Sequence, residues 1–336
     1  MTSRHRLSLA AVLAGMLALA ACSGGSSDTA APTSAAPTAS STATSAEAGT
    51  ATVASAFGDV EIPAAPKRVV ALEGAVGPLL AAGITPVATA DGDWEDAFLP
   101  AEFDQVKDLP VVLGPDGWDY EAIAAAKPDL LIGFVRAGTV DEISPEAVAE
   151  HARLSGIAPT VLILADGSAS TKDATLKIAE IVGSGTQATE AKAAYDAKAA
   201  QIRETYAGAL AAHTFAAVDH YEGIVTVYTP ISWLGGILTD VGASIDPVAA
   251  DATGTNGVDL STEELTRLSP DSVILTEQAL DGTPGIGAEE LDAVPTYTTL
   301  PAVAAGHAYG VQYFFADRYE TGLKVLDQLE TILAGL

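Results

Sequence analysis

The sequence predicts an α/β fold with two lobes on either side of a helical connector. Short, continuously apolar runs alternate with helix-like segments in both halves of the chain, and such runs are typical of parallel strands that helices cover on both faces. Residues 171–212 interrupt this alternation with a stretch that is helical throughout, except at the break formed by Gly183, Ser184 and Gly185. The chain has 336 residues, of which 49% are hydrophobic, and this is sufficient for two cores.

The N-terminal segment has the features of a secretory signal. Basic residues at positions 4–6 precede a mostly apolar run at 7–21, which is shorter than the roughly 20 residues that a membrane span requires. The run ends in Leu-Ala-Ala-Cys, which resembles a bacterial lipobox. By this resemblance residues 1–22 are a lipoprotein signal peptide and Cys22 carries the lipid. An ordinary signal with an incidental cysteine is the alternative.

The segment that follows, residues 23–52, consists of Ser, Thr, Ala, Gly and Pro apart from Asp28 and Glu47. Such a segment has little to bury, so we expect a disordered tether. Cys22 is the only cysteine of the chain, which excludes an intramolecular disulfide and leaves no thiol for metal binding or catalysis after lipidation. The expected location is the extracytoplasmic face of the cell membrane, through the lipid anchor.

The first lobe, expected over 53–170, begins with a hairpin-like alternation and continues with strands and helices in turn. Asp119 is placed to cap one of these helices, and Pro128 ends it because proline cannot donate the helical hydrogen bond. The predicted strands are 67–72, 86–91, 110–114, 130–135 and 159–164, and the predicted helices are 77–84, 119–127 and 145–155.

The helical connector at 171–212 leads to a second α/β lobe, expected over 213–317, and a closing helix at 318–336. Predicted strands in this lobe are 214–221, 224–228, 272–276 and 307–311, and helix-like segments are 232–242, 260–268 and 300–306. The phrases AIAAAKPDLLI at 122–132 and ELTRLSPDSVI at 264–274 are similar, each with a helix-like run, Pro-Asp and a strand. We interpret them as one helix-to-strand unit used once per lobe.

The charge balance excludes some functions. Forty-four acidic residues against 16 basic ones argue against nucleic-acid binding, which requires a basic surface. The acids are best explained as a solvating surface, with a site for a cationic ligand as the alternative. The sequence contains no P-loop, G-x-S-x-G or H-E-x-x-H motif, so we expect no enzymatic activity. An exported enzyme or structural protein stays as the alternative.

Five phrases together carry a resemblance to a known family. They are PKRVVALEG with LLAAGITPVATAD, EAIAAAKPDLLIG, LSGIAPTVLIL, VDLSTEELTRLSPDSVILT and LPAVAAGHAYGV. In this order they resemble the bacterial substrate-binding lipoproteins of ABC importers for iron–siderophore complexes, a fold shared with haem and cobalamin binders. The resemblance covers about residues 53–336. It implies two Rossmann-like lobes joined by a long helix, a ligand cleft between them, a ferric siderophore and a permease as partners, and a monomer.

Candidate ligand residues follow from the rule that ligands bind beyond the carboxyl ends of strands in open α/β sheets. Aromatic side chains there offer large apolar faces, and arginine offers a planar donor fork for chelate oxygens. Core packing is the alternative for each aromatic residue, and an internal salt bridge is the alternative for each arginine. The candidates are Trp94, Trp118, Arg136, Tyr221, Tyr228, Trp233, Tyr313, Phe315 and Arg318.

The iron of a ferric siderophore is coordinated by the chelator, so the resemblance implies no metal ligand and no cofactor from the protein. A haem ligand would require an axial residue, and His220 and Tyr221 keep that option open. Members of the family usually carry an exposed Glu in each lobe that pairs with Arg of the permease. An ungapped comparison places these positions at Gly77 and Gly236, with Glu73 and Asp240 nearby as substitutes.

Overall fold

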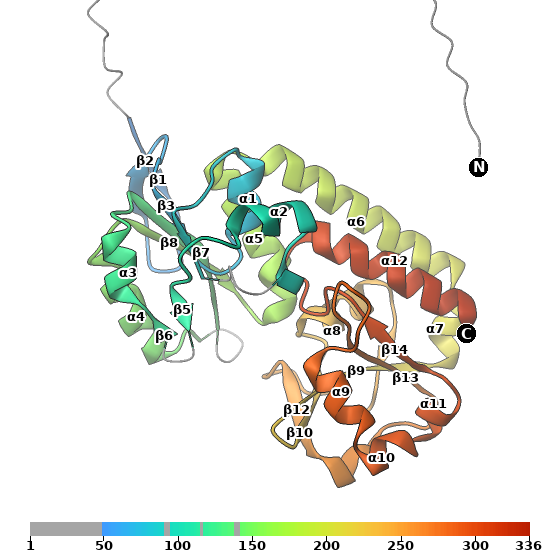
Figure 1. Ribbon diagram of the computed structural model, residues 1–336. Coiled ribbons are helices and arrows are strands. Elements are labelled where there is room, and N and C mark those ends of the chain that lie inside the picture. Colours follow the sequence, from blue (N-terminus) through green and yellow to red (C-terminus); the bar gives the residue numbers. More distant parts are fainter. Residues whose placement is uncertain (1–48, 91–94, 115–116, 138–141) are drawn as a thin grey trace, which may run out of the picture. The chain divides into compact units, whose positions relative to one another are not determined.

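A four-stranded parallel sheet lies at the centre of the first lobe (Figure 1). The computed structural model describes residues 49–90, 95–114, 117–137 and 142–336. The strand order is β4, β3, β7, β8, with bounds Ala88–Thr89, Val69–Ala71, Leu130–Arg136 and Thr160–Ala165. All neighbouring pairs are parallel, which confirms the predicted α/β class in this lobe.

Helices cover both faces of this sheet, because successive strand residues point to opposite sides. Val69 and Ile132 belong to a core shared with side chains of α1, α2 and α5, whereas Val70 and Leu131 pack with side chains of α3 and α4. The helix bounds are Val76–Ala81 for α1, Pro100–Val106 for α2, Tyr120–Ala125 for α3, Pro145–Ser155 for α4 and Thr171–Val182 for α5. The continuous apolar strands in the sequence reflect this burial on two sides.

Two aspartates fix the local geometry around α3. Asp119 caps the helix as predicted, accepting a hydrogen bond of 2.9 Å from the backbone N–H of Ala122. Asp129, directly after Pro128, accepts bonds from the backbone N–H groups of Lys67 and Arg68 at 2.7 and 2.9 Å. It therefore ties the end of one helix-to-strand unit to the start of β3.

Two short antiparallel hairpins complete the first lobe. β1 (Thr50–Val53) pairs with β2 (Val60–Pro63), so the predicted hairpin is present, and it begins before Val53. The second hairpin joins β5 (Leu113–Gly114) to β6 (Gly117–Trp118). A 3₁₀ turn, η1 (Glu95–Ala97), precedes α2.

The predicted helical stretch consists of three helices. α5 ends at Gly183, whose φ of 96° is in the left-handed region that favours glycine, and a 3₁₀ turn, η2 (Ser168–Ser170), precedes it. α6 (Gly185–Thr205) and α7 (Ala207–Ala212) follow. The closing helix, α12 (Tyr319–Gly335), packs along α6, and Figure 1 shows the two side by side.

The second lobe contains a six-stranded sheet that is mixed rather than wholly parallel. Its order is β12, β10, β9, β13, β14, with β11 also paired to β9. The bounds are Thr214–Tyr221 for β9, Ile224–Tyr228 for β10, Ser244–Ile245 for β11, Gly257–Ser261 for β12, Ser272–Glu277 for β13 and Ala308–Val311 for β14. β10 is antiparallel to both β9 and β12. Only Glu222 and Gly223 separate β9 from β10, and a two-residue link permits a hairpin but no crossover.

Four helices and a 3₁₀ segment surround this sheet. The helices are α8 (Trp233–Asp240), α9 (Ile286–Asp292), α10 (Pro295–Thr298) and α11 (Pro301–Ala304). The second copy of the repeated phrase forms η3 (Thr262–Arg267), a 3₁₀ helix where the first copy forms an α-helix. Leu265 and Leu268 are nevertheless buried, as the interpretation of a shared scaffold unit requires.

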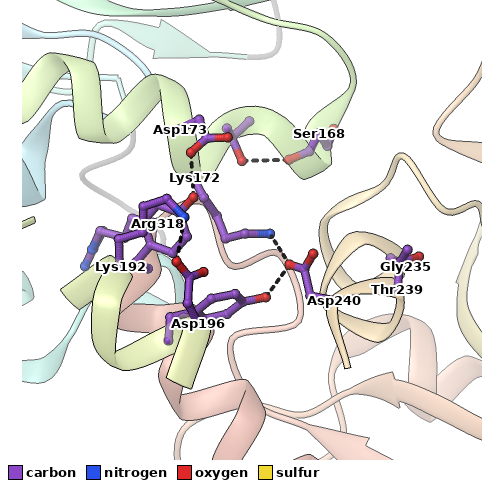
Figure 2. A network of polar contacts seen from close by, with 12 residues as sticks. Ser168, Lys172, Asp173, Lys192, Asp196, Gly235, Thr239, Asp240 and Arg318 are labelled. Carbon is purple, nitrogen blue, oxygen red and sulfur yellow. Dashed lines mark hydrogen bonds and ion pairs between the residues drawn. The ribbon is translucent and has the colours of Figure 1, made fainter. Parts of the chain in front are cut away.

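A buried polar contact joins α5 of the first lobe to α8 of the second. Lys172 is only 5% exposed, and its Nζ lies 3.7 Å from Oδ2 of Asp240. Figure 2 shows the two side chains facing each other. The hydroxyl of Tyr195, on α6, donates a hydrogen bond of 2.7 Å to the same oxygen. Burial lowers the pKa of Lys172, and the neighbouring Asp240 partly offsets this effect.

Asp240→Ala should destabilise the protein because it removes the carboxylate that faces the buried Lys172 ammonium. Asp240 is itself 45% exposed, so we expect a loss of about 1–2 kcal/mol in the free energy of unfolding rather than the full cost of an unpaired buried charge. Lys172→Met removes the charge and keeps the chain length, and should cost less. Urea denaturation measures both variants. An equal or larger loss in Lys172→Met would contradict this account.

Candidate functional site

A cavity of about 300 Å³ lies beyond the carboxyl ends of β3 and β7. Elements of the second lobe complete it, namely the first turn of α8 and the segment that precedes α12. This is the position where α/β proteins bind ligands. The lining residues are Glu73, Gly74, Val76, Ala97, Phe98, Phe134, Arg136, Trp233, Phe315, Asp317 and Arg318.

Aromatic rings supply most of the apolar surface of the cavity. Phe98 and Phe134 come from the first lobe, and Trp233 and Phe315 come from the second. The centroids of the Trp233 and Phe315 rings are 5.3 Å apart in an edge-to-face arrangement. Tyr228 supports both, with ring centroids 6.4 and 6.0 Å away. This packing holds the second-lobe wall in one geometry, with apolar faces available to a ligand.

Arg136 lies at the end of β7 and is held from three directions. Its Nη2 donates to Oε1 of Glu73 at 2.9 Å. Its guanidinium carbon is 5.3 Å from the Trp233 ring centroid and 5.7 Å from that of Phe134. Burial raises the pKa of Glu73, while the charge of Arg136 lowers it. The side chain of Arg136 is 35% exposed, so its free donors can meet a ligand.

Arg318 lies deeper, with 4% of its surface exposed. It forms an ion pair with Glu102 of α2, and its Nη1 is 3.6 Å from Oδ1 of Asp317. Burial raises the pKa of the Asp317 carboxyl, and Arg318 opposes that shift. Arg318 therefore connects the start of α12 to the first lobe while it forms part of the cavity floor.

The structure brings four of the predicted residues to the cavity: Arg136, Trp233, Phe315 and Arg318. Tyr228 lies behind this wall, and Tyr313, 9% exposed with a φ of 57°, lines a small neighbouring pocket. Whether any of these residues contacts a ligand stays a prediction.

The other candidates lie elsewhere. The indole N–H of Trp118 donates to Oε2 of Glu150 at 3.4 Å, and the ring packs against the α3–α4 side of the first lobe. Tyr221 is 70% exposed at the end of β9. Trp94 and Cys22 are outside the residues that the structure describes.

Sequence reasoning missed several lining residues. Glu73 follows β3 almost directly, so the rule that selected Arg136 after β7 would also have selected it. Phe134 lies within β7 and is indistinguishable in sequence from a core residue. Asp317 lies beside Arg318, and in the sequence nothing distinguishes it from the many other acids.

His220 lies outside the described cavity, and the two glycines at the family's usual Glu positions are buried. His220 is 9% exposed, its Nδ1 is 2.6 Å from Oε2 of Glu290, and it does not line the described cavity. Gly77 and Gly236 are both buried. A Cβ atom at Gly236 would lie 2.5 Å from Cβ of Ala169, so a glutamate does not fit there.

Two further acids, one from each lobe, lie beside the cavity. Asp96 and Glu277 line the small pocket next to it, which shares Ala97 and Phe315 with the main cavity. Oδ1 of Asp96 accepts a bond of 3.1 Å from the backbone N–H of Leu280. Burial, followed by the charges of Asp219 and Asp96, raises the pKa of Glu277 to about 7.

No group of three His, Cys, Asp or Glu side chains in the described ranges is arranged to hold a metal ion. Within the same part of the chain, no helix combines the length and apolar character needed to cross a membrane.

Comparisons with known proteins agree on one family. The family model described as periplasmic binding protein matches residues 69–312. The structure of the siderophore periplasmic binding protein from the fuscachelin gene cluster of Thermobifida fusca is 35% identical, with a TM-score of 0.72, and the match covers 82% of this chain and 99% of that one.

Two relatives from Bacillus subtilis (strain 168) are more distant. YhfQ, provisionally assigned as an ABC transporter substrate-binding lipoprotein, is 26% identical over 265 residues, which cover 76% of this chain and 79% of YhfQ. The iron(3+)-hydroxamate-binding protein YxeB is 28% identical over 153 residues, which cover 46% of this chain and 42% of YxeB.

The raised pKa of Glu277 predicts a pH-dependent stability. Its carboxyl ionises near 4.5 when unfolded and near 7 when folded, so between these values the folded protein keeps a proton that the unfolded chain releases. The contribution of Glu277 to the free energy of unfolding should therefore fall as the pH rises from about 4.5 to about 7, and it should remain lower above that pH. Glu277→Gln cannot ionise, and we expect it to gain about 1–3 kcal/mol over the parent at about pH 8 relative to about pH 4.5. Urea midpoints at both pH values measure this, and a pH-independent difference would refute it.

Proposed function

Because the chain belongs to the periplasmic binding protein family, we propose that it is an extracytoplasmic, lipid-anchored binding protein that captures an iron(III)–siderophore complex and delivers it to an ABC import permease. The family consists of binding proteins and not of enzymes. The observation that supports the proposal most is the cavity, which combines aromatic walls from both lobes with one half-exposed arginine at the carboxyl end of a parallel strand.

The cavity suits a bulky, partly apolar chelate. Trp233 and Phe315 present faces to the apolar backbone of such a ligand, and Arg136 has donors for oxygens at the edge of the iron centre. The chelator fills the coordination shell of the iron, so the protein is required to recognise only the outside of the complex. The similarity to a siderophore periplasmic binding protein over nearly its whole length supports this ligand class.

The lipid anchor rests on the sequence and on one relative. The Leu-Ala-Ala-Cys sequence ends an apolar segment, and YhfQ is described as a lipoprotein. Delivery to a permease rests on the family relationship. The buried Gly77 and Gly236 do not supply the exposed acids that family members usually carry at these positions, so docking would use other acids of this acidic surface.

Truncation of the aromatic wall should weaken binding. Trp233→Ala removes an indole that lines the cavity and contacts Arg136, and we expect a Kd for a bound ferric siderophore about tenfold higher. Isothermal titration calorimetry measures the affinity without depending on tryptophan fluorescence. Phe57→Ala is the matched control, because Phe57 is a partly buried ring that stacks on His151 outside the cavity. An unchanged Kd in Trp233→Ala would show that the ligand does not bind in this cavity. A Soret band in protein isolated from the source cells would show that the ligand is haem and not a ferric siderophore.

Lipidation depends on the thiol of Cys22. Cys22→Ala should abolish incorporation of labelled palmitate, because no other cysteine is present. Labelling of cells that express either form measures this. Continued incorporation of label in the variant would contradict the assignment.

A further inference from the structure

The charges around the cavity are unusual for a protein that would bind an anionic chelate. The lining contains two cations, Arg136 and Arg318, and two carboxyls, Glu73 and Asp317. Glu102, which is outside the lining, forms an ion pair with Arg318. Asp96 and Glu277 line the adjoining pocket. The described acids within or beside the cavity therefore outnumber the described bases.

Both cations already have partners inside the protein. Arg136 donates to Glu73 at 2.9 Å, and Arg318 is paired with Glu102 and lies 3.6 Å from Asp317. A negatively charged ligand that took over either arginine as its own counter-ion would separate such a pair. The separated carboxylate would then remain without its cation in a largely apolar cavity, which is costly.

Protonation of some of these acids does not make the arginines outnumber the ionised carboxylates. If Glu73, Asp317 and Glu277 all kept their protons, Glu102 and Asp96 would still equal the two arginines in number. The undescribed segments 91–94, 115–116 and 138–141 contain no lysine or arginine in the sequence, so they supply no further cation. The cavity lining taken together with Glu102, Asp96 and Glu277 has no net positive charge in any of these protonation states.

We propose that the ligand is a ferric complex of zero or positive net charge, and that Glu73 is the residue that excludes anionic complexes by occupying Arg136. This inference rests on the proposed function and specifies its substrate class. A basic group on the ligand would find Glu73, Asp317, Asp96 and Glu277 within the same region. A neutral complex would bind through the aromatic walls and through the free donors of Arg136.

The test uses one iron-coordinating unit with three different charges. Ferric desferrioxamine B carries a pendant ammonium outside the trihydroxamate centre and is cationic, its N-acetyl derivative is neutral, and its N-succinyl derivative is anionic. Ferric enterobactin, a tris-catecholate, adds a strongly anionic complex of another class. Affinities come from calorimetry with the full-length protein at low ionic strength, where charge effects are largest.

The expected order is that the cationic and neutral complexes bind at least tenfold more tightly than the N-succinyl complex, and that ferric enterobactin does not bind. Equal or tighter binding of either anionic complex would overturn the charge inference and leave the proposed function intact. If none of these ferric complexes binds, the proposed function fails and the charge inference fails with it. The two failures are therefore distinguishable.

The role of Glu73 is tested by Glu73→Gln, which keeps a partner for Arg136 and removes the negative charge. The preference for the cationic over the N-succinyl complex should narrow at least threefold. Glu263→Gln is the matched control, since it removes one exposed acid in η3, far from the lining. An unchanged preference in Glu73→Gln, with the fold intact by circular dichroism, would overturn the role of Glu73.

Discussion

The short segment that leads into α12 is bonded to the first lobe, and the position of the cavity depends on it. Arg318 pairs with Glu102 of α2, the backbone carbonyl of Asp317 accepts a bond of 3.1 Å from Thr175 of α5, and the hydroxyl of Tyr319 donates to Asp173 at 2.5 Å. The rest of α12 packs along α6. Asp317 and Arg318 are thus held in the cavity floor by a helix that contacts elements from both halves of the chain. Residues that line the cavity are here also residues that hold the fold together.

Much of this arrangement was predictable from the sequence because it depends on local rules. Buried parallel strands need continuous apolar runs, Pro128 must end a helix, and Gly183 suits a left-handed helix end. The same reasoning selected Arg136 and Trp233 because each follows a strand, and in the structure both line the cavity. The expected ligand contacts themselves remain predictions, since the structure shows the cavity and not its occupant.

Two candidate residues, Tyr221 and Trp118, lie away from the cavity because of how their strands pair, and local sequence patterns do not encode strand pairing. Tyr221 is the last residue of β9, and β10 returns antiparallel through Glu222 and Gly223, so the tyrosine lies at an exposed hairpin end rather than in the cavity. Trp118 lies in a two-residue strand whose partner, β5, is equally short. Conversely, the strand-end rule reaches Glu73 after β3, but its pairing with Arg136 is a tertiary contact that no local pattern encodes.

Three of the few basic residues of this acidic chain form ion pairs near the cavity. Arg136, Lys172 and Arg318 all lie where the two lobes meet, and each faces a carboxylate of the same chain. Each pair lowers the cost of burying its charged groups, and each acid holds its cation in one geometry. A ligand therefore meets a surface whose strongest charges already have partners. Recognition at such a surface must rest on shape, aromatic contact and directional hydrogen bonds, which discriminate between chelates through their outer groups and not through the iron they share.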